Sequence, residues 1–496
     1  MSYGLFKKFL IGFFIANILC LLGAMFTANI AVSDEFEHIH VAWLVWDGHV
    51  PYRDFLEHHH PLMWYLFAPL IGLFEGNILI FYGVRLIMAA CSLWMLYLVY
   101  KIIKNYLADD IAAWIAINIF CFSALVLNTM VHFKPDTLMH LFFWLGTYYF
   151  FSYLHEKRQL KLNMCAICYT VAFFFLQTAV FLIIPVGLVF IYLLLTKTVT
   201  IKECAKAAVI PLILVLSAIL FMYFNGSLQR YYELNWVVNS HIADYLSPES
   251  HTLEKNATEI ASRRINDYSD YYGTLIIGLC CALYLLFRKK DKYTRIFLLM
   301  YFIELMLRTL YLSPYVYYFK TLLLYNAVLM GIVATDIYKL RSYAAYFMLI
   351  LFIPCLLKIY PFQRDMEKML LDTTGSTQEI TITSILGVIT DITKNSSRDD
   401  MVLGITVIPF GVFNQNPHYY WFSWDYIGYI DEMLYHYAPP FDMQKIITEV
   451  QPKFIYFEND LLPNYKPKSR FDIDPVLLNK YYRKAIYNTL YLRKED

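Results

Sequence analysis

Long apolar runs separated by short polar turns dominate the pattern along this chain. Roughly eleven of these runs approach the length of about 20 residues that a membrane-spanning helix needs. They begin near residues 5, 78, 109, 137, 162, 179, 207, 272, 296, 316 and 343. A further apolar stretch, residues 61–74, is too short to span and is predicted to form a re-entrant or interfacial helix. The pattern therefore predicts a polytopic α-helical membrane protein.

Lysine and arginine gather in alternate turns between the apolar runs. The rich turns lie near residues 101–104, 157–161, 197–206, 288–295 and 339–341. Because cytoplasmic loops carry this excess of basic residues, we expect these turns in the cytoplasm. Lys7 and Lys8 precede the first run, which lacks an obvious cleavage site and is predicted to be an uncleaved anchor. The N-terminus is then cytoplasmic, and the chain after residue 360 lies outside.

The residues after 360 break with the apolar pattern. Residues 373–384 are polar, and MVLGITVI and KFIYFEND have the character of short buried strands. The sequence thus predicts two domains. Residues 1–360 form a transmembrane catalytic domain, and residues 361–496 form a small exterior α/β domain.

Composition agrees with this division, since 59% hydrophobic and 18% aromatic residues exclude an ordinary soluble domain. The basic residues sit at the ends of spans rather than on one face, so no nucleic-acid partner is expected. The nine cysteines fall in or beside apolar runs, which argues against a disulfide framework. Cys165 and Cys168 form a CxxC pair inside a span and are predicted to be packing residues.

The candidate chemistry lies in the first polar loop, which we define as residues 32–62. It gathers six acidic residues (Asp34, Glu35, Glu37, Asp47, Asp54 and Glu57) and six histidines (His38, His40, His49, His58, His59 and His60). Ser33 is placed to cap a helix whose first turn carries Asp34 and Glu35, where the helix dipole favours carboxylates.

An apolar stripe follows on the same predicted helix, formed by Phe36, Ile39, Trp43 and Trp46. Tryptophans at this spacing are typical of a helix that lies at the level of the lipid headgroups. Gly48 and Pro51 are expected to end the helix, and a second short segment over residues 52–60 is expected to run until Pro61.

Three exterior motifs are similar to those of a known family. The loop opens on Asp34-Glu35 and closes on an element made of Gly48, Pro51, Tyr52, Asp54, Phe55 and Pro61. Lys134-Pro135-Asp136 follows in the next exterior turn, and Ser313-Pro314-Tyr315 with Tyr317 in a later one. Together they resemble the GT-C superfamily of membrane glycosyltransferases, in the protein O-mannosyltransferase-like (glycosyltransferase family 39-like) bacterial branch.

This resemblance implies a GT-C-like fold and an inverting transfer on the exterior face of the bacterial inner membrane. The donor would be a sugar on a polyprenyl phosphate similar to undecaprenyl phosphate, and the acceptor a cell-envelope glycan, a lipid or a protein. It also implies a set of donor-binding and phosphate-binding residues, namely Tyr52, Arg53, Lys134, Asp136 and Tyr317.

Inverting transfer needs a carboxylate that takes the proton of the acceptor hydroxyl while the phosphate leaves. Asp34 is the natural base, with Glu35 as the second catalytic candidate. Glu35 or Glu37 could instead orient the acceptor or a histidine, and a headgroup-facing acid without a role is the alternative for Asp34. Glu37 and His38 are as readily interpreted as residues of a solvated face.

Glu57, His58, His59 and His60 form a candidate metal site, since imidazole and carboxylate suit zinc or manganese. Because consecutive residues rarely converge on one ion, stacking or hydrogen bonding to a sugar is the alternative. No other cofactor is expected.

A transporter, flippase or polymerase of lipid-linked glycans is the alternative function. Such a protein would carry internal symmetry and charged or broken segments near mid-membrane. This chain instead concentrates its ionisable residues in exterior loops, which favours an enzyme.

Overall fold

The computed structural model describes residues 3–27, 33–121, 130–240, 257–289, 291–310, 320–340, 382–405, 411–419, 440–457, 473–484 and 490–494. The chain forms two compact units. The first comprises Met1–Ala28, Arg85–Ala218 and His241–Thr377, and the second Asn29–Val84, Ile219–Ser240 and Gln378–Asp496. The first polar loop and the C-terminal residues thus share one unit. The predicted domain boundary after residue 360 lies outside the described residues and stays a prediction.

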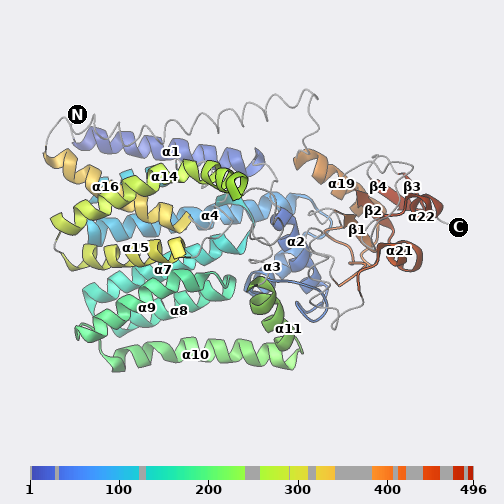
Figure 1. Cartoon of the computed structure of the whole chain (residues 1–496), viewed down its shortest axis with the longest axis horizontal. Coiled ribbons are helices and arrows are strands. Elements are labelled where there is room, and N and C mark those ends of the chain that lie inside the picture. The colour runs from blue at the N-terminus through green and yellow to red at the C-terminus, as the bar shows by residue number, and fades with distance from the viewer. Residues whose placement is uncertain are drawn as a thin grey trace. The chain divides into compact units, whose positions relative to one another are not determined.

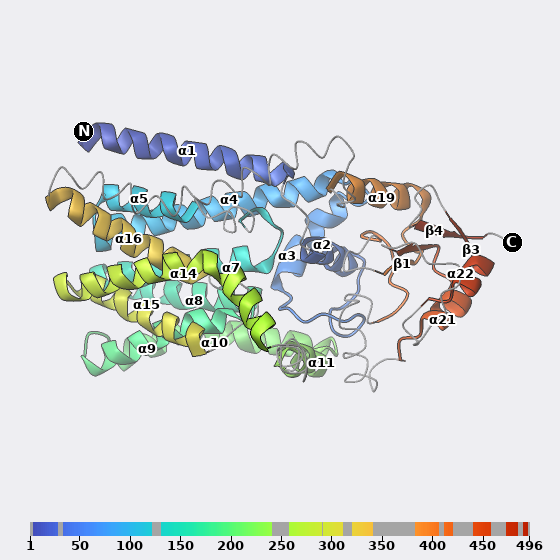
Figure 2. The ribbon, with the colours of Figure 1, turned by 45° about the horizontal axis from the view of Figure 1, so that its top comes forward.

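The first unit is helical. Figures 1 and 2 show its long helices side by side with roughly aligned axes. The helices that lie wholly or mostly in this unit are α1 (Tyr3–Thr27), α4 (Leu79–Ile102), α5 (Asp110–Cys121), α7 (Pro135–Glu156), α8 (Gln159–Phe175), α9 (Ala179–Leu195), α10 (Ile201–Phe224), α14 (Ala257–Arg288), α15 (Lys292–Leu310) and α16 (Lys320–Leu340). A π-helical turn, η1 (Ile103–Leu107), extends α4. The first ten predicted apolar runs coincide with these helices, while the run near residue 343 lies outside the described residues.

Within the described residues, four helical segments are long and apolar enough to cross a membrane: Gly4–Gly23, Leu79–Leu107, Ile201–Phe224 and Thr321–Lys339. Others, such as α8 and α9, are apolar but shorter. Helix α10 exposes large apolar side chains, including Leu212, Leu220 and Phe224. An apolar surface of this kind suits a lipid environment. The chain is therefore a multi-pass helical membrane protein, and the total of eleven spans stays a prediction.

The interior of the first unit holds a few paired polar groups. Glu304 on α15 is 1% exposed, and its Oε1 accepts a hydrogen bond of 2.9 Å from Nε of Arg308, one turn further along the helix. Burying a carboxylate in such surroundings is costly unless it is paired, which explains why both residues point inward.

The second unit combines helices with a small mixed sheet. Its helical segments are α2 (Ser33–Trp46), α3 (Leu62–Leu73), α11 (Leu228–Tyr232), the π-helical η2 (Glu233–Val238), α19 (Ile382–Asn395), α21 (Met443–Lys445), the π-helical η6 (Ile446–Val450) and α22 (Pro475–Tyr481). Helix α3 confirms the predicted short helix after Pro61, whereas its interfacial placement stays a prediction.

Four strands form the sheet in the order β1-β2-β4-β3. They are β1 (Val402–Ile405), β2 (Phe454–Phe457), β3 (Tyr482–Lys484) and β4 (Leu490–Arg493). The two strands predicted from sequence, β1 and β2, pair in parallel, while β4 runs antiparallel to both β2 and β3. Ile455 of β2 is fully buried, as expected for a central strand. The C-terminal part of the chain is thus α/β, as predicted.

Candidate active site

Helix α2 carries the predicted catalytic acids at its start. Asp34 and Glu35 occupy its first turn, where the helix dipole stabilises their negative charge. Asp34 is half-buried, whereas Glu35 is 1% exposed. The geometry thus leaves Asp34 as the more accessible of the two acids.

The expectation that α2 lies among lipid headgroups is wrong for its apolar stripe. Phe36, Ile39 and Trp43 are all fully buried. The indole N–H of Trp43 donates a hydrogen bond of 2.8 Å to Oε1 of Glu75, and the ring of Phe36 packs on that of Phe81. The stripe is buried because α3 and the start of α4 cover it. Only Trp46, at 43% exposed, reaches the surface.

After α2 the chain turns sharply, as predicted. Gly48 has φ +95°, a conformation that favours glycine. Residues 52–60 form no helix but an irregular loop, in which Tyr52 has φ +68° and Pro51 forms an isolated β-bridge with Phe55. Tyr52 is 1% exposed, and its hydroxyl donates a 2.5 Å hydrogen bond to the carbonyl of His59. This contact gives Tyr52 a role in shaping the loop, and its contact with a donor phosphate stays a prediction.

The three consecutive histidines do not share one partner. The Nε2 atom of His60 lies 2.9 Å from the Tyr231 hydroxyl, while the Nδ1 atoms of His59 and His58 lie 2.8 and 3.6 Å from Oε1 of Glu57. Asn239 holds the backbone just before His59 by donating a 2.8 Å hydrogen bond to the carbonyl of His58. The run as a whole therefore does not converge on one point.

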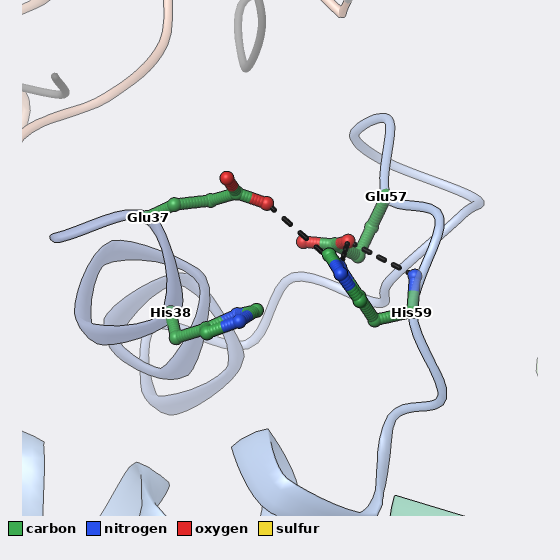
Figure 3. A group of neighbouring side chains, drawn as sticks. All are labelled: Glu37, His38, Glu57 and His59. Atoms are coloured by element: carbon green, nitrogen blue, oxygen red, sulfur yellow. Dashed lines mark hydrogen bonds and ion pairs between the residues drawn. The ribbon is translucent and has the colours of Figure 1, made fainter. Parts of the chain in front are cut away.

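A different set of four side chains does converge. Glu37 and His38 from α2 meet Glu57 and His59 from the loop, with their ligating atoms within 4.8 Å of one another (Figure 3). We call this set the Glu–His cluster. Glu37, His38 and Glu57 are buried and His59 is half-buried. The predicted metal residues are therefore corrected in part: Glu57 and His59 belong to the cluster, whereas His58 and His60 do not.

Charge in the Glu–His cluster is set by burial and by neighbours. Burial alone would raise the pKa of Glu57, but the hydrogen bond and charge of His59, together with the backbone N–H of His58, lower it overall. Burial lowers the pKa of His58 to about 3, with His59 adding to the effect and Glu57 and Asp34 opposing it. His58 is thus neutral at pH 7 and close enough to Asp34 for the two to interact.

The predicted phosphate-binding cations lie in different units. Arg53 belongs to the second unit, where its guanidinium donates two 2.8 Å hydrogen bonds to Asp54 and remains 43% exposed in its side chain. Lys134 and Asp136 belong to the first unit, at the start of α7, and are half-buried. Their approach to the loop stays a prediction. Tyr317 lies outside the described residues.

Residues 411–419 hold the loop in place, which sequence reasoning missed. His40 on α2 lies 3.0 Å from the carbonyl of Val412 through Nδ1 and 2.8 Å from Oδ1 of Asn416 through Nε2. Gln415 donates a 2.6 Å hydrogen bond to Oδ2 of Asp47. The Tyr419 hydroxyl donates a 2.5 Å hydrogen bond to the carbonyl of Tyr52. In the sequence, the polar character of residues 411–419 was the feature that could have indicated these contacts.

One part of the chain, which begins in the first polar loop, matches a known protein family. Residues 58–223 match the family described as dolichyl-phosphate-mannose-protein mannosyltransferase. The match agrees with the resemblance drawn from the motifs: over residues 58–223 the chain is similar to this family of membrane glycosyltransferases. No curated protein matches it in sequence.

Solved structures with a similar course of the chain come from two enzymes. The oligosaccharyltransferase of Archaeoglobus fulgidus, in complex with Zn and sulfate, is 14% identical, with 70% of this chain and 52% of that one covered and a TM-score of 0.47. The chain thus spans about half the length of that enzyme. ArnT from Cupriavidus metallidurans bound to undecaprenyl phosphate is 11% identical (78% and 69% covered, TM-score 0.45). Its apo form is 12% identical (77% and 68% covered, TM-score 0.43).

Proposed function

We propose that this protein is an inverting glycosyltransferase that moves a sugar from a polyprenyl-phosphate donor to an acceptor on the exterior face of the membrane. The observation that carries the proposal is the family match over residues 58–223, because the family's description names a sugar on a polyprenyl phosphate as donor. An undecaprenyl-phosphate-like carrier in the bacterial inner membrane is the corresponding donor here. The acceptor would be a cell-envelope glycan, a lipid or a protein.

Asp34 is the proposed general base. Its carboxylate lies half-buried at the start of α2, while the neighbouring Glu35 is enclosed. In the transfer, Asp34 takes the proton from the acceptor hydroxyl as the acceptor oxygen attacks the anomeric carbon. The bond from that carbon to the phosphate oxygen breaks on the opposite side, so the configuration inverts. Glu35 would keep the start of α2 in position.

The leaving polyprenyl phosphate needs positive charge. Arg53 is the accessible cation of the loop, with a side chain that is 43% exposed. Its pairing with Asp54 fixes the guanidinium in one orientation and leaves part of it open to an anion. We propose that Lys134 supplies a second charge from the turn before α7, with Asp136 and Tyr317 close to the donor.

The membrane orientation follows from the basic turns. We propose that the N-terminus is cytoplasmic and that the C-terminal residues lie outside, because lysine and arginine concentrate in alternate turns. A donor carried by a lipid then reaches the loop by lateral diffusion, whereas nucleotide sugars are not normally available on that side.

The test of Asp34 is its replacement by asparagine, which keeps the shape and removes the base. Transfer by Asp34→Asn should fall by roughly two to four orders of magnitude, the usual scale for loss of a general base. Asp399→Asn is the matched control, because Asp399 is an exposed acid of the same unit. Turnover is measured as release of polyprenyl phosphate from a labelled lipid-linked sugar. Near-normal turnover by folded Asp34→Asn would remove Asp34 from the mechanism.

A further inference from the structure

We propose that the Glu–His cluster binds one divalent transition-metal ion, with Glu37, Glu57 and His59 as its ligands. Binding of the ion does not depend on the proposed transfer reaction. Only a role of the ion in catalysis would rest on the proposed function.

The geometry of the cluster suits a small ion. The Nδ1 atom of His59 lies 2.8 Å from Oε1 of Glu57 and 4.0 Å from Oε1 of Glu37. Nitrogen and oxygen ligands lie about 2.0–2.2 Å from zinc, which places neighbouring ligand atoms roughly 3–4 Å apart. Small rotations of three side chains therefore suffice to surround an ion. Figure 3 shows these side chains facing one another from α2 and from the loop.

A buried oxygen gives the second, independent indication. The side chain of Glu57 is 0% exposed. Its Oε1 accepts hydrogen bonds from the backbone N–H groups of His58 and His59. Its Oε2, by contrast, is buried and has no hydrogen-bond partner within the part of the chain that the structure describes. A carboxylate oxygen without a partner in such a place is costly, and a cation would satisfy it.

Charge points to a cation as well. Two carboxylates, Glu37 and Glu57, are 8% and 0% exposed in their side chains and lie on either side of His59. Buried like charges are unfavourable unless a cation compensates them. A mixed set of carboxylate and imidazole ligands favours zinc or manganese over magnesium, which keeps oxygen ligands and water.

When an ion binds, His59 gives up the proton that it shares with Glu57, so that bond is replaced within the cluster. His38 is left out of the ligand set because its hydrogen bond is made to a residue outside the cluster. The indole N–H of Trp64 lies 3.3 Å from Nδ1 of His38 and donates to it, so Nδ1 carries the lone pair and Nε2 the proton. Binding an ion through Nε2 would require the loss of that bond. Three protein ligands then leave a coordination position open for water or substrate.

The site would act close to the proposed base. Asp34 and Glu37 are three residues apart on α2 and therefore project from the same side of the helix. An ion held by Glu37 would contribute positive charge near the reacting groups. The cluster therefore connects the start of α2 to the histidine run of the loop.

The test uses the full-length protein in detergent after exhaustive treatment with a chelator. We expect calorimetric titration with Zn²⁺ or Mn²⁺ alone to give one site per chain, and Mg²⁺ to give none at the same concentrations. In Glu57→Gln/His59→Gln the affinity should fall by more than about 100-fold, because losing outer partners of a metal alone costs 10–100-fold. His49→Gln is the matched control, since His49 belongs to the same loop but not to the cluster. It should bind like the wild type.

His38→Asn separates the three-ligand site from a four-ligand site and should change the affinity by less than about 10-fold. If the double variant does not fold, Glu37→Gln, which alters a ligand at the rim of the cluster, takes its place with the same expected direction. Absence of a site in the wild type would overturn the proposal. Equal affinity in the wild type and the ligand variants would do so too. Because neither donor nor acceptor is present, either result leaves the proposed transfer reaction standing.

Discussion

The histidines of the first polar loop differ in their surroundings, and these surroundings decide what each can do. His49 is 36% exposed in its side chain and bonds to Gln415, whereas His40 is 1% exposed and lies between the carbonyl of Val412 and Asn416. Burial lowers the pKa of His40 from 6.5 to about 4, an effect that its two hydrogen bonds oppose. His40 is therefore neutral at pH 7, and its protonation is unfavourable in the folded protein.

This predicts a loss of stability in mild acid. Because the unfolded chain binds the proton of His40 at a higher pH than the folded chain, the free energy of unfolding decreases as the pH falls from about 6.5 towards 4. The contribution amounts to at most about 3 kcal/mol. In His40→Gln the dependence of the free energy of unfolding on pH should be shallower. Denaturant unfolding at several pH values measures this pH dependence of the free energy of unfolding. Equal slopes for His40→Gln and the wild type would contradict this account of His40.

At the scale of elements, residues 411–419 hold the first polar loop through hydrogen bonds, and we call this segment the clasp. Leu56 N–H donates a 3.0 Å hydrogen bond to the carbonyl of Tyr419, and the Tyr419 hydroxyl donates to the carbonyl of Tyr52. The loop between these points has little regular structure of its own. Its order therefore depends on a segment more than 360 positions away in sequence.

Tyr419→Phe removes one of these contacts while keeping the ring. The lost hydrogen bond is worth about 1 kcal/mol, so we expect backbone amides in residues 47–57 to exchange roughly fivefold faster. Helix α8, in the first unit, should be unaffected. Tyr481→Phe on α22 provides a control that leaves the loop untouched. Hydrogen exchange followed by mass spectrometry distinguishes the outcomes, and unchanged protection of the loop would show that the clasp does not order it.

Sequence patterns predicted elements that depend on local periodicity and missed those that depend on distant pairing. The apolar runs and the start of α2, with its two acids in the first turn, were predicted correctly, as were β1 and β2, whose residues are strongly apolar. Strands β3 and β4 were missed because they are short and carry charged residues such as Arg483, Lys484 and Arg493. Their pairing with each other and with β2 makes them strands.

The same distinction holds for the site. Asp34, Glu57 and His59 were singled out because acidic residues and histidines gather there. The pairing of Glu37 and His38 with the loop was not predicted, since spacing along the chain cannot show that the loop folds back onto α2. The surroundings of Trp43 were predicted wrongly for the same reason. An apolar stripe that lipid covers and one that protein covers have the same sequence pattern.

At the scale of the whole molecule, the family match and the apolar helices both support the proposed enzyme that works on a lipid-borne substrate. The first unit supplies the helices that suit a membrane, and α2 and the loop of the second unit carry the proposed chemistry. Within this loop the Gly48 turn is no glycine-rich phosphate cradle of the kind that binds a nucleotide diphosphate. The donor should therefore be held through its single phosphate and its lipid chain.

The most direct test of the proposed function is a comparison of two donors with the purified protein in lipid nanodiscs. One is a labelled sugar on undecaprenyl phosphate, and the other is the same sugar on a nucleotide diphosphate with no lipid-linked sugar present. We predict transfer, with release of undecaprenyl phosphate, from the first donor only. Efficient transfer from the nucleotide sugar, with none from the lipid-linked sugar, would contradict the proposed function.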